Sequence, residues 1–357
     1  MLMNQQMELL KKEYFSINNR KRLLLAGLAA LVFLAVMWSM NVGPSTVDVK
    51  TVWRVLCDQF YQPDAALTDA ERVIVMKIRL PRICASILVG VLLANAGLLM
   101  QGIFQNPLVS PYTLGVSNGA AFGASLAIVL AAGMSSVTAA NNLVSLLAFV
   151  FAALTMYLVQ LIGKIAKDST KNLLLAGVAV SYLFSSLVSF IKYTVDEKEL
   201  PALVFWQMGS VSDVSWNKIT IMLIITIISL LIMTIFSWDL NVIATGEESA
   251  ISLGVNYKRL RRIAFLLSTL MTGVAVAFAG TIGFVGMVAP HVARMIVGND
   301  YRYTIPTASL CGALLLLVAD SLSRMMVSTV SLPIGVITSM IGVPFFIWLI
   351  VRKRGEV

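Results

Sequence analysis

Charged side chains are scarce in this sequence. Of its 357 residues, 13% are charged and 58% are hydrophobic, whereas a soluble domain is about a quarter charged and about half apolar. The apolar residues also form long blocks, which recur from Leu23 to the last few residues. Because a membrane-spanning helix needs about 20 mainly apolar residues, these blocks predict membrane spans and leave no room for a sizeable soluble domain.

Cysteine and histidine, which hold many structural metal ions, are nearly absent. Cys57, Cys84 and Cys311 are isolated and have no CxxC spacing, which argues against a disulfide framework and a zinc site. His291 is the single histidine, and one histidine without partners cannot hold a metal ion. We therefore interpret His291 as a helix-packing residue and predict neither a metal nor a cofactor.

The sequence also lacks the motifs of two enzyme classes. No GxxxxGK[ST] occurs, since Gly163-Lys164 is followed by isoleucine, so the chain has no P-loop for ATP. The segment 115–119 fits the GxSxG pattern of serine hydrolases, but it opens an apolar helix instead of following a strand, and the histidine lies in a different block. We predict that the chain is not an enzyme and that, if it pumps, another subunit supplies the energy.

The net charge of +9 suggests nucleic-acid binding at first sight. However, the basic residues lie at the ends of apolar blocks and not on one polar face, which a nucleic-acid site would need. Basic residues at block ends are typical of the cytoplasmic loops of membrane proteins. We therefore predict contact with membrane lipid and no nucleic-acid partner.

Ten apolar blocks predict an all-α polytopic membrane protein with about ten transmembrane helices. They cover approximately residues 23–41, 82–103, 113–132, 143–163, 172–192, 218–238, 260–279, 281–298, 304–322 and 332–351. No small-residue cleavage site follows the first block, which indicates an uncleaved helix. We expect a cytoplasmic N-terminal tail over residues 1–22, a permease domain over 23–351 and a cytoplasmic C-terminal tail over 352–357.

The distribution of lysine and arginine predicts the orientation. With ten spans, both termini lie on one side of the membrane, and compact basic clusters at 164–171, 258–262 and 352–354 fall on that side. The positive-inside rule makes it the cytoplasm. The 42–81 loop is the exception, because it is also basic although it falls on the outer side.

A weak internal symmetry suggests a duplication. The segment 82–111 contains Arg-Ile, then Ala-Gly, then Pro, and the segment 262–290 contains the same residues in the same order. Half of ten helices is an odd number, so the second half would be inverted, as in many transporters. Two inverted five-helix halves are therefore possible, although chance similarity between apolar segments is the alternative.

Ionisable residues stand at the ends of two blocks. Asp320 and Arg324 are spaced i, i+4, so they can pair on one helix face. An intramembrane carboxylate could instead be a proton relay, but the position near the outer boundary favours an ion pair that presents Arg324 outward. Arg79 and Arg82 flank Pro81, which suits the first turn of a helix. These two arginines are either interfacial anchors or a docking point for an acidic partner.

A short helix is predicted in the loop before residue 260. Thr245 and Glu248 have the spacing of a capping box, and Gly254 follows as a left-handed stop. A helix of about two turns is too short to be stable alone. We expect it to rest on the membrane surface or in a groove of a partner protein.

Several stretches together resemble the FecCD-type permeases, the membrane subunits of importers for iron–siderophore complexes, haem and vitamin B12. In the family's order, from about residue 77 to 351, they are RLPRICASILVGVLLANAG, QNPLVSPYTLGVSNGA, NLLLAGVAVSY, FWQMGS, GEESAISLGV, GTIGFVGMVAPHVARMIVG and LPIGVITSMIGVPFFIWLI. The resemblance implies a type II ABC importer permease fold in the bacterial cytoplasmic (inner) membrane. It also implies a homodimer with the pathway at its interface, two ATP-binding cassette ATPase subunits and a solute-binding protein.

The resemblance also assigns roles to residues. It implies docking of the binding protein at Arg79, Arg82 and Arg324. It implies an ATPase-coupling helix that includes Gly246, Glu247, Glu248, Ala250, Leu253 and Gly254. The implied cytoplasmic gate is Ser169, Thr170 and Lys171, where Lys171 departs from the small polar residue of the family pattern.

The motifs leave the cargo open among metal chelates. We predict a ferric siderophore, with haem or vitamin B12 as alternatives. The alternative class is a secondary transporter driven by an ion gradient, which would need carboxylates or a broken helix at the membrane midplane. No acidic residue lies in the middle of an apolar block, which favours the ATP-driven importer.

Overall fold

The ten apolar blocks each form a helix. The computed structural model describes residues 2–43, 48–60, 67–166, 169–326 and 332–353, and among these residues it contains helices and no strand. The ten principal helices are α1 (Leu2–Asn41), α4 (Leu80–Phe104), α5 (Val116–Ala131), α6 (Val137–Ile165), α7 (Thr170–Thr194), α9 (Trp216–Ile235), α12 (Tyr257–Ala279), α13 (Val285–Val297), α14 (Tyr301–Met326) and α15 (Ile334–Lys353). The predicted all-α fold is confirmed.

Shorter elements connect the principal helices. They are α2 (Val49–Phe60), α3 (Asp69–Val73), the π-helical η1 (Ile74–Arg79), the 3-10 helix η2 (Pro111–Leu114), α8 (Leu200–Met208), α10 (Ser237–Ile243) and α11 (Glu247–Ser252). Seven helices of the described part of the chain are long and apolar enough to cross a membrane, and α5, α13 and α15 supply three shorter apolar segments.

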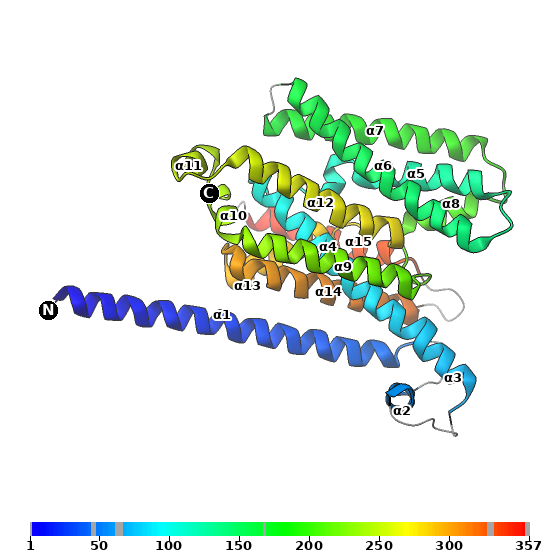
Figure 1. Ribbon diagram of the computed structural model, residues 1–357, viewed down its shortest axis with the longest axis horizontal. Helices are drawn as coiled ribbons and strands as arrows, with labels where there is room; N and C mark the ends of the chain where they lie inside the picture. The colour runs from blue at the N-terminus through cyan, green and yellow to red at the C-terminus, as the bar shows by residue number, and fades with distance from the viewer. Residues whose placement is uncertain (1, 44–47, 61–66, 167–168, 327–331, 354–357) are drawn as a thin grey trace.

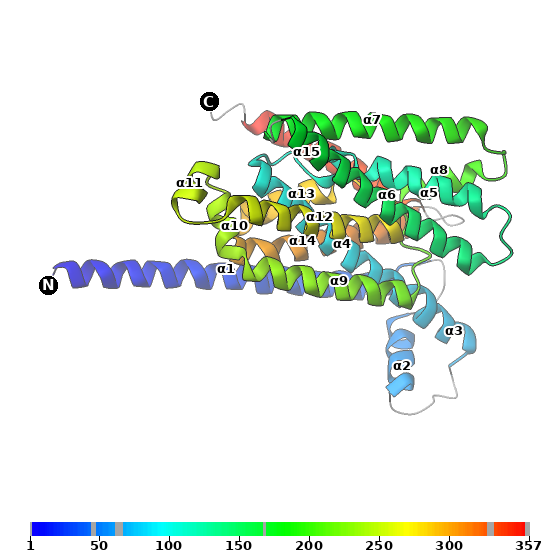
Figure 2. The same cartoon turned by 45° about the horizontal axis from the view of Figure 1, so that its top comes forward.

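The helices run along one common direction, so the bundle has two ends (Figure 1). Helix α1 begins and α15 finishes at the end where α11 lies, which we name the inner end. Helices α2 and α3 lie at the opposite end, which we name the outer end (Figures 1 and 2). The common position of the two chain ends agrees with an even number of spans.

Helix α4 lies in the middle of the bundle. Of its most apolar stretch, 89% is buried, and it packs on α12, α13 and α14. A Cβ atom on Gly90 would overlap the backbone of Gly312 in α14, and one on Gly97 would overlap the backbone of Gly286 in α13. Small residues permit such close helix packing in membranes. The glycines therefore bring α4 into backbone contact with its neighbours.

Residues 2–22 are helical as part of α1, and their place as a cytoplasmic tail stays a prediction. One sequence boundary needs correction. The eighth block was expected from residue 281, but α13 begins at Val285 because the preceding segment is held by other contacts. The backbone N–H of Ile282 donates to the Tyr112 hydroxyl at 2.9 Å, and Phe284 has a left-handed backbone with φ 67°. An apolar pattern alone does not reveal such a break.

Candidate functional sites

Helix α11 is a short inner-end helix with defined stops. Gly246 precedes it with φ 123°, and Gly254 follows it with φ 80°. At its end the N–H of Val255 donates to the carbonyl of Ala250 at 3.0 Å, and the N–H of Gly254 donates to the carbonyl of Ile251 at 3.0 Å. These two bonds are the Schellman pattern, which satisfies the last carbonyls of a helix. The predicted glycine stop is confirmed.

The predicted capping box at the start of α11 is wrong. The residue before the helix is Gly246, which makes no side-chain cap. The Thr245 hydroxyl instead donates to the carbonyl of Val242 in α10 at 2.7 Å. The chain turns sharply between α10 and α11, and glycine suits a backbone with positive φ. The helix therefore starts two residues after the threonine and has six residues.

Helix α11 presents apolar and acidic side chains away from the bundle. Ala250 is fully buried, whereas Ile251 is 61% exposed and Leu253 is 68% exposed. Glu247 and Glu248 are also exposed, in the first turn, where the helix dipole favours negative charge. One small residue thus anchors the helix, and its larger side chains remain free for contact with another protein.

A polar clamp fixes α10, and with it α11, to the inner ends of α14 and α4. The Asn241 amide donates to the Asp300 carboxylate at 3.0 Å and accepts from the backbone N–H of Tyr301 at 2.7 Å. Gln105, at the end of α4, donates to the carbonyl of Ile243 at 3.2 Å. We name these contacts the Asn241–Asp300 clamp. Sequence reasoning missed it because its partners lie far apart in the chain.

Electrostatics hold the Asp300 carboxylate in its ionised form. Partial burial raises its pKa, but hydrogen bonds from Arg302 and Asn241 outweigh burial and lower the pKa to about 2. Arg302 lies 2.6 Å from the carboxylate and stacks over the Trp238 ring in α10 at 4.3 Å. The arginine therefore makes a second connection between α14 and α10.

The predicted gate residues lie where α7 begins. Ser169 caps the helix, since its hydroxyl accepts from the N–H of Asn172 at 3.2 Å. Thr170 and Lys171 form the first turn and are exposed. The three residues therefore form the capped, exposed start of α7 at the inner end of the bundle (Figure 1).

At the outer end, Asp320 lies between two arginines. The Nε atom of Arg82 lies 2.6 Å from one carboxylate oxygen, and the Nη2 atom of Arg324 lies 3.0 Å from the other. Asp320 is fully buried, and both arginine side chains are at most 10% exposed. Removing one partner from a buried ion pair is costly, so the structure depends on all three residues. We name them the Arg–Asp–Arg cluster.

The arginines also hold the last turn of α1. Arg324 donates to the carbonyl of Ser39 at 3.0 Å and to the carbonyl of Val42 at 2.5 Å. Arg79 donates to the carbonyl of Met40. The last carbonyls of a helix have no partner within the helix, and cations stabilise that end. Arg79 and Arg324 therefore act as caps supplied from other helices.

The outer arginines do not lie as the sequence predicted. Arg324 was expected to point outward from its ion pair, but it turns inward onto α1 and is buried. Arg79 and Arg82 are 4% and 8% exposed. The predicted pair of Asp320 with Arg324 is present, whereas the contact of Arg82 with the same carboxylate was not predicted.

A mostly apolar cavity with several polar lining residues lies beside α5, α8 and α15. Its volume is about 830 Å³. Its polar lining residues are Tyr112, Ser117, Asn118, Gln207, Thr281 and Ser339. Ser117 and Asn118 belong to the GxSxG segment that the sequence analysis rejected as a hydrolase motif, and the other residues were given no role, because scattered uncharged polar side chains form no motif.

Comparison with known proteins decides the family. The family model described as the FecCD transport family matches residues 31–352. This chain belongs to that family. Relatives of this chain align with it over most of their length. The ABC transporter permease protein MJ0087 of Methanocaldococcus jannaschii is 38% identical, over 94% of this chain and 97% of its own length.

Other FecCD relatives have names that state different cargoes. The hemin transport system permease protein HmuU of Yersinia pestis is 34% identical, over 94% of this chain and 97% of its own length. Relatives named for iron(3+)-hydroxamate in Bacillus subtilis, vitamin B12 in Klebsiella pneumoniae and molybdate in Haemophilus influenzae are 34–36% identical. They align over 93–94% of this chain and 83–96% of their own length.

A solved structure supports the same assignment. It is described as an inward-facing conformation of a transporter of the metal-chelate ABC type. It matches with a TM-score of 0.79 and 32% identity, over 92% of this chain and 98% of its own. The predicted family and helical permease fold are thereby confirmed, and the relatives are transport subunits.

Proposed function

We propose that this chain is the membrane-spanning subunit of an ATP-driven importer that carries a ferric siderophore across the bacterial cytoplasmic membrane. The observation that carries the proposal is the FecCD match over residues 31–352, which includes nearly every described helix. Haem and vitamin B12 are the alternative cargoes, since relatives of similar identity carry those names. The inner end of the bundle is then cytoplasmic.

We propose that two copies form the translocation pathway between them. Three serines of α7, Ser185, Ser186 and Ser189, are exposed in the single chain, and α7 lies at the edge of the bundle (Figure 2). Polar side chains within spanning helices normally face other protein or a water-filled cavity. A second copy that covers this face supports alternating access at the interface.

The ATPase subunits are proposed to bind at α11. Its exposed Ile251 and Leu253 would enter an apolar groove of each ATPase. The Asn241–Asp300 clamp would then pass movement of α11 to α14 and α4. The gate residues at the start of α7 lie at the same end of the bundle, where they could close the pathway.

The solute-binding protein is proposed to dock at the outer end. Arg82 and Arg324 pair with the single carboxylate of Asp320 there, and Arg79 caps α1 beside them, so this cluster carries more positive than negative charge. Complementary charge speeds association even without direct contact. Acidic residues of the binding protein would be attracted, and the arginines would at the same time hold α1.

A secondary transporter driven by an ion gradient is not supported. Among the described residues, Asp320 is the one carboxylate residue that is buried. It is paired with two arginines and lies near the outer end of α14. A carboxylate that is already compensated is a poor carrier of protons or cations.

Reconstitution tests the proposal. The chain is placed in liposomes with its ATPase subunits and binding protein, and uptake of ferric hydroxamate, haem and cobalamin is measured with and without ATP. We expect ATP-dependent uptake of the ferric hydroxamate. Uptake of only haem or cobalamin would show that the proposed siderophore cargo is wrong. Uptake driven by an ion gradient without ATP would show that the chain is not part of an ATP-driven importer.

A further inference from the structure

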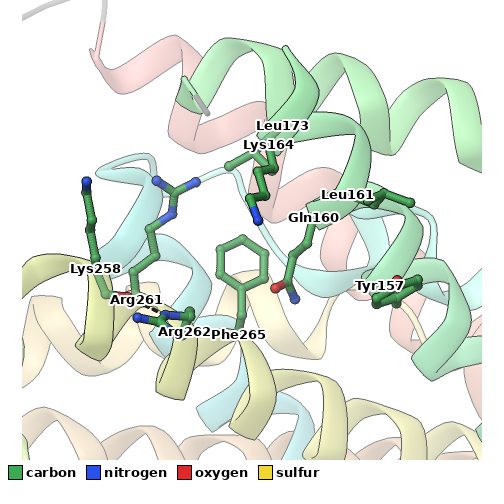
Figure 3. Close-up of a pocket in the computed structure, with 9 residues that line it drawn as sticks. All are labelled: Tyr157, Gln160, Leu161, Lys164, Leu173, Lys258, Arg261, Arg262 and Phe265. Atoms are coloured by element: carbon green, nitrogen blue, oxygen red, sulfur yellow. Dashed lines mark hydrogen bonds between the residues drawn. The ribbon is translucent and has the colours of Figure 1, made fainter. Parts of the chain in front are cut away.

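A second cavity opens at the inner end, apart from the sites described above. It lies between α6, α7 and α12, and its volume is about 620 Å³ (Figure 3). Its lining residues are Tyr157, Gln160, Leu161, Lys164, Leu173, Lys258, Arg261, Arg262 and Phe265. We name it the basic cavity.

Four of the nine lining residues are cations, and none of the nine is acidic. Lys164 extends from the end of α6 toward α12, and Arg261 extends from α12 toward α6 and α7 (Figure 3). Lys258 and Arg262 are exposed in the first turns of α12. Basic residues in the first turn do not stabilise a helix, so the stability of α12 does not explain them.

Apart from Gln160, the rest of the lining of the basic cavity is aromatic or aliphatic. Tyr157 precedes Lys164 by seven residues, which is roughly 10 Å along a helix. Tyr157 is 61% exposed and Leu161 is 41% exposed, and Leu173 and Phe265 complete the apolar lining. The cavity therefore has cations at the inner end of the helices and apolar walls that continue along α6 into the apolar part of the bundle.

We propose that the basic cavity binds an anionic phospholipid, with its phosphate between Lys164, Lys258 and Arg262 and one acyl chain along Leu161 and Tyr157. Basic pockets between membrane helices at the cytoplasmic side suit such headgroups. An acidic side chain of a partner protein would match the cations but leave the apolar part empty. A lipid matches both parts.

The position of the cavity gives the lipid a role. It joins the end of α6 and the start of α12, and Leu173 in its wall lies in the first turns of α7, just after the gate residues. Helix α12 follows directly after α11. A bound headgroup would neutralise repulsion among the four cations and hold these helix ends together.

Native mass spectrometry of the purified full chain tests the site. The chain is equilibrated with phosphatidylglycerol, with phosphatidylcholine, or with soluble glycerol 3-phosphate. We expect retained phosphatidylglycerol and little retention of the other two. Each of Lys164→Gln, Lys258→Gln and Arg262→Gln should weaken retention about fivefold, and the triple variant on the order of a hundredfold, because a basic residue near an anionic surface contributes about 1 kcal/mol.

Arg259→Gln is the matched control. Arg259 is exposed in the same turn of α12 but does not line the cavity, so its substitution should leave retention unchanged. Equal loss in this control, or equal retention of phosphatidylcholine, would mean that the cations serve only topology and would overturn the proposal. So would tight binding of glycerol 3-phosphate, or full retention of phosphatidylglycerol by the triple variant.

Discussion

Asp320 contacts two arginines from different helices, and only one contact follows a sequence rule. Arg324 lies one turn away on the same helix, so spacing alone predicts their pairing. Arg82 lies 2.6 Å from the same carboxylate although 238 residues separate the two in the chain. Rules based on the spacing of residues within one helix cannot predict a contact between residues so far apart in the chain. The inward direction of Arg324 also depends on α1, whose last carbonyls need donors.

Asp320→Asn should destabilise the chain strongly. The change leaves Arg82 and Arg324 buried together without a carboxylate, and breaking such a buried arrangement costs roughly 3–5 kcal/mol. Thermal unfolding of the purified chain in detergent measures the loss. Adding Arg82→Met to Asp320→Asn should recover part of it. Asp58→Asn is the control, because its partner Arg72 is 33% exposed and the loss should stay below about 1 kcal/mol.

Charge at Arg79 should affect docking of the binding protein more than side-chain shape does. Arg79→Met should slow association by a factor of about five at most, and Arg79→Lys should preserve most of the rate. Replacing Arg79, Arg82 and Arg324 together with alanine should reduce the association rate severely. Association with the reconstituted transporter is measured at low and high salt. A triple variant with unchanged affinity and salt dependence would show that these arginines serve only as internal caps.

At the scale of elements, helix α11 should depend on the backbone of Gly254. Its φ of 80° costs a residue with a side chain roughly 1–2 kcal/mol. Gly254→Val should therefore lower ATP-driven transport while the chain still inserts and assembles. Gly133→Val is the matched control, since both glycines have open space around them but only Gly254 has positive φ. Normal transport by a Glu248→Ala/Gly254→Val double variant would contradict the role of α11.

The Asn241–Asp300 clamp should give stability that depends on pH. The folded pKa of Asp300 is about 2, below the ordinary value of 3.8, so the contribution is complete above roughly pH 4 and is lost as the pH falls toward the folded pKa. Its size is about 1 kcal/mol once solvent screening is allowed for. The stability advantage of wild type over Asp300→Asn should shrink between neutral pH and about pH 3. Glu197 is exposed, so wild type and Glu197→Gln should not differ in stability by a comparable amount at any pH. A stability difference between wild type and Asp300→Asn that stays constant with pH would contradict the role of the clamp.

Long apolar segments were easier to predict than the short helices between them. All ten blocks form helices, because a stretch of about 20 apolar residues has few other stable structures in a membrane. Helices α2, α8 and α10 were missed, since short helices depend on tertiary contacts. Thr245 shows the same effect. It has the spacing of a capping box, but the turn at Gly246 makes the glycine the residue before α11, and the Thr245 hydroxyl bonds to α10 instead.

At the scale of the whole molecule, the chain alone should neither hydrolyse ATP nor move cargo. The sequence has no P-loop, and its relatives are permease subunits. The purified chain in liposomes should show background rates in both assays, and adding the ATPase subunits should raise ATP turnover. Turnover by the highly purified single chain would contradict the assignment.

The proposed inverted repeat remains a prediction. It pairs α4 with α12, the second helix of each half, and Arg82 with Arg262 near their starts. Both helices are well buried, with 89% and 67% of their apolar stretches covered. Superposition of the two halves, with the second inverted, would test whether a duplication placed them there.

Helices α4 and α14 meet at Gly90 and Gly312 without a side chain between their backbones. At one end this pair carries the Arg–Asp–Arg cluster, and at the other it receives the Asn241–Asp300 clamp. Because no side chain at this contact can change rotamer to take up a displacement, we expect a displacement of one end of the α4–α14 pair to tilt the pair as a unit. Binding at one face of the membrane should then alter the position of these helices at the other face.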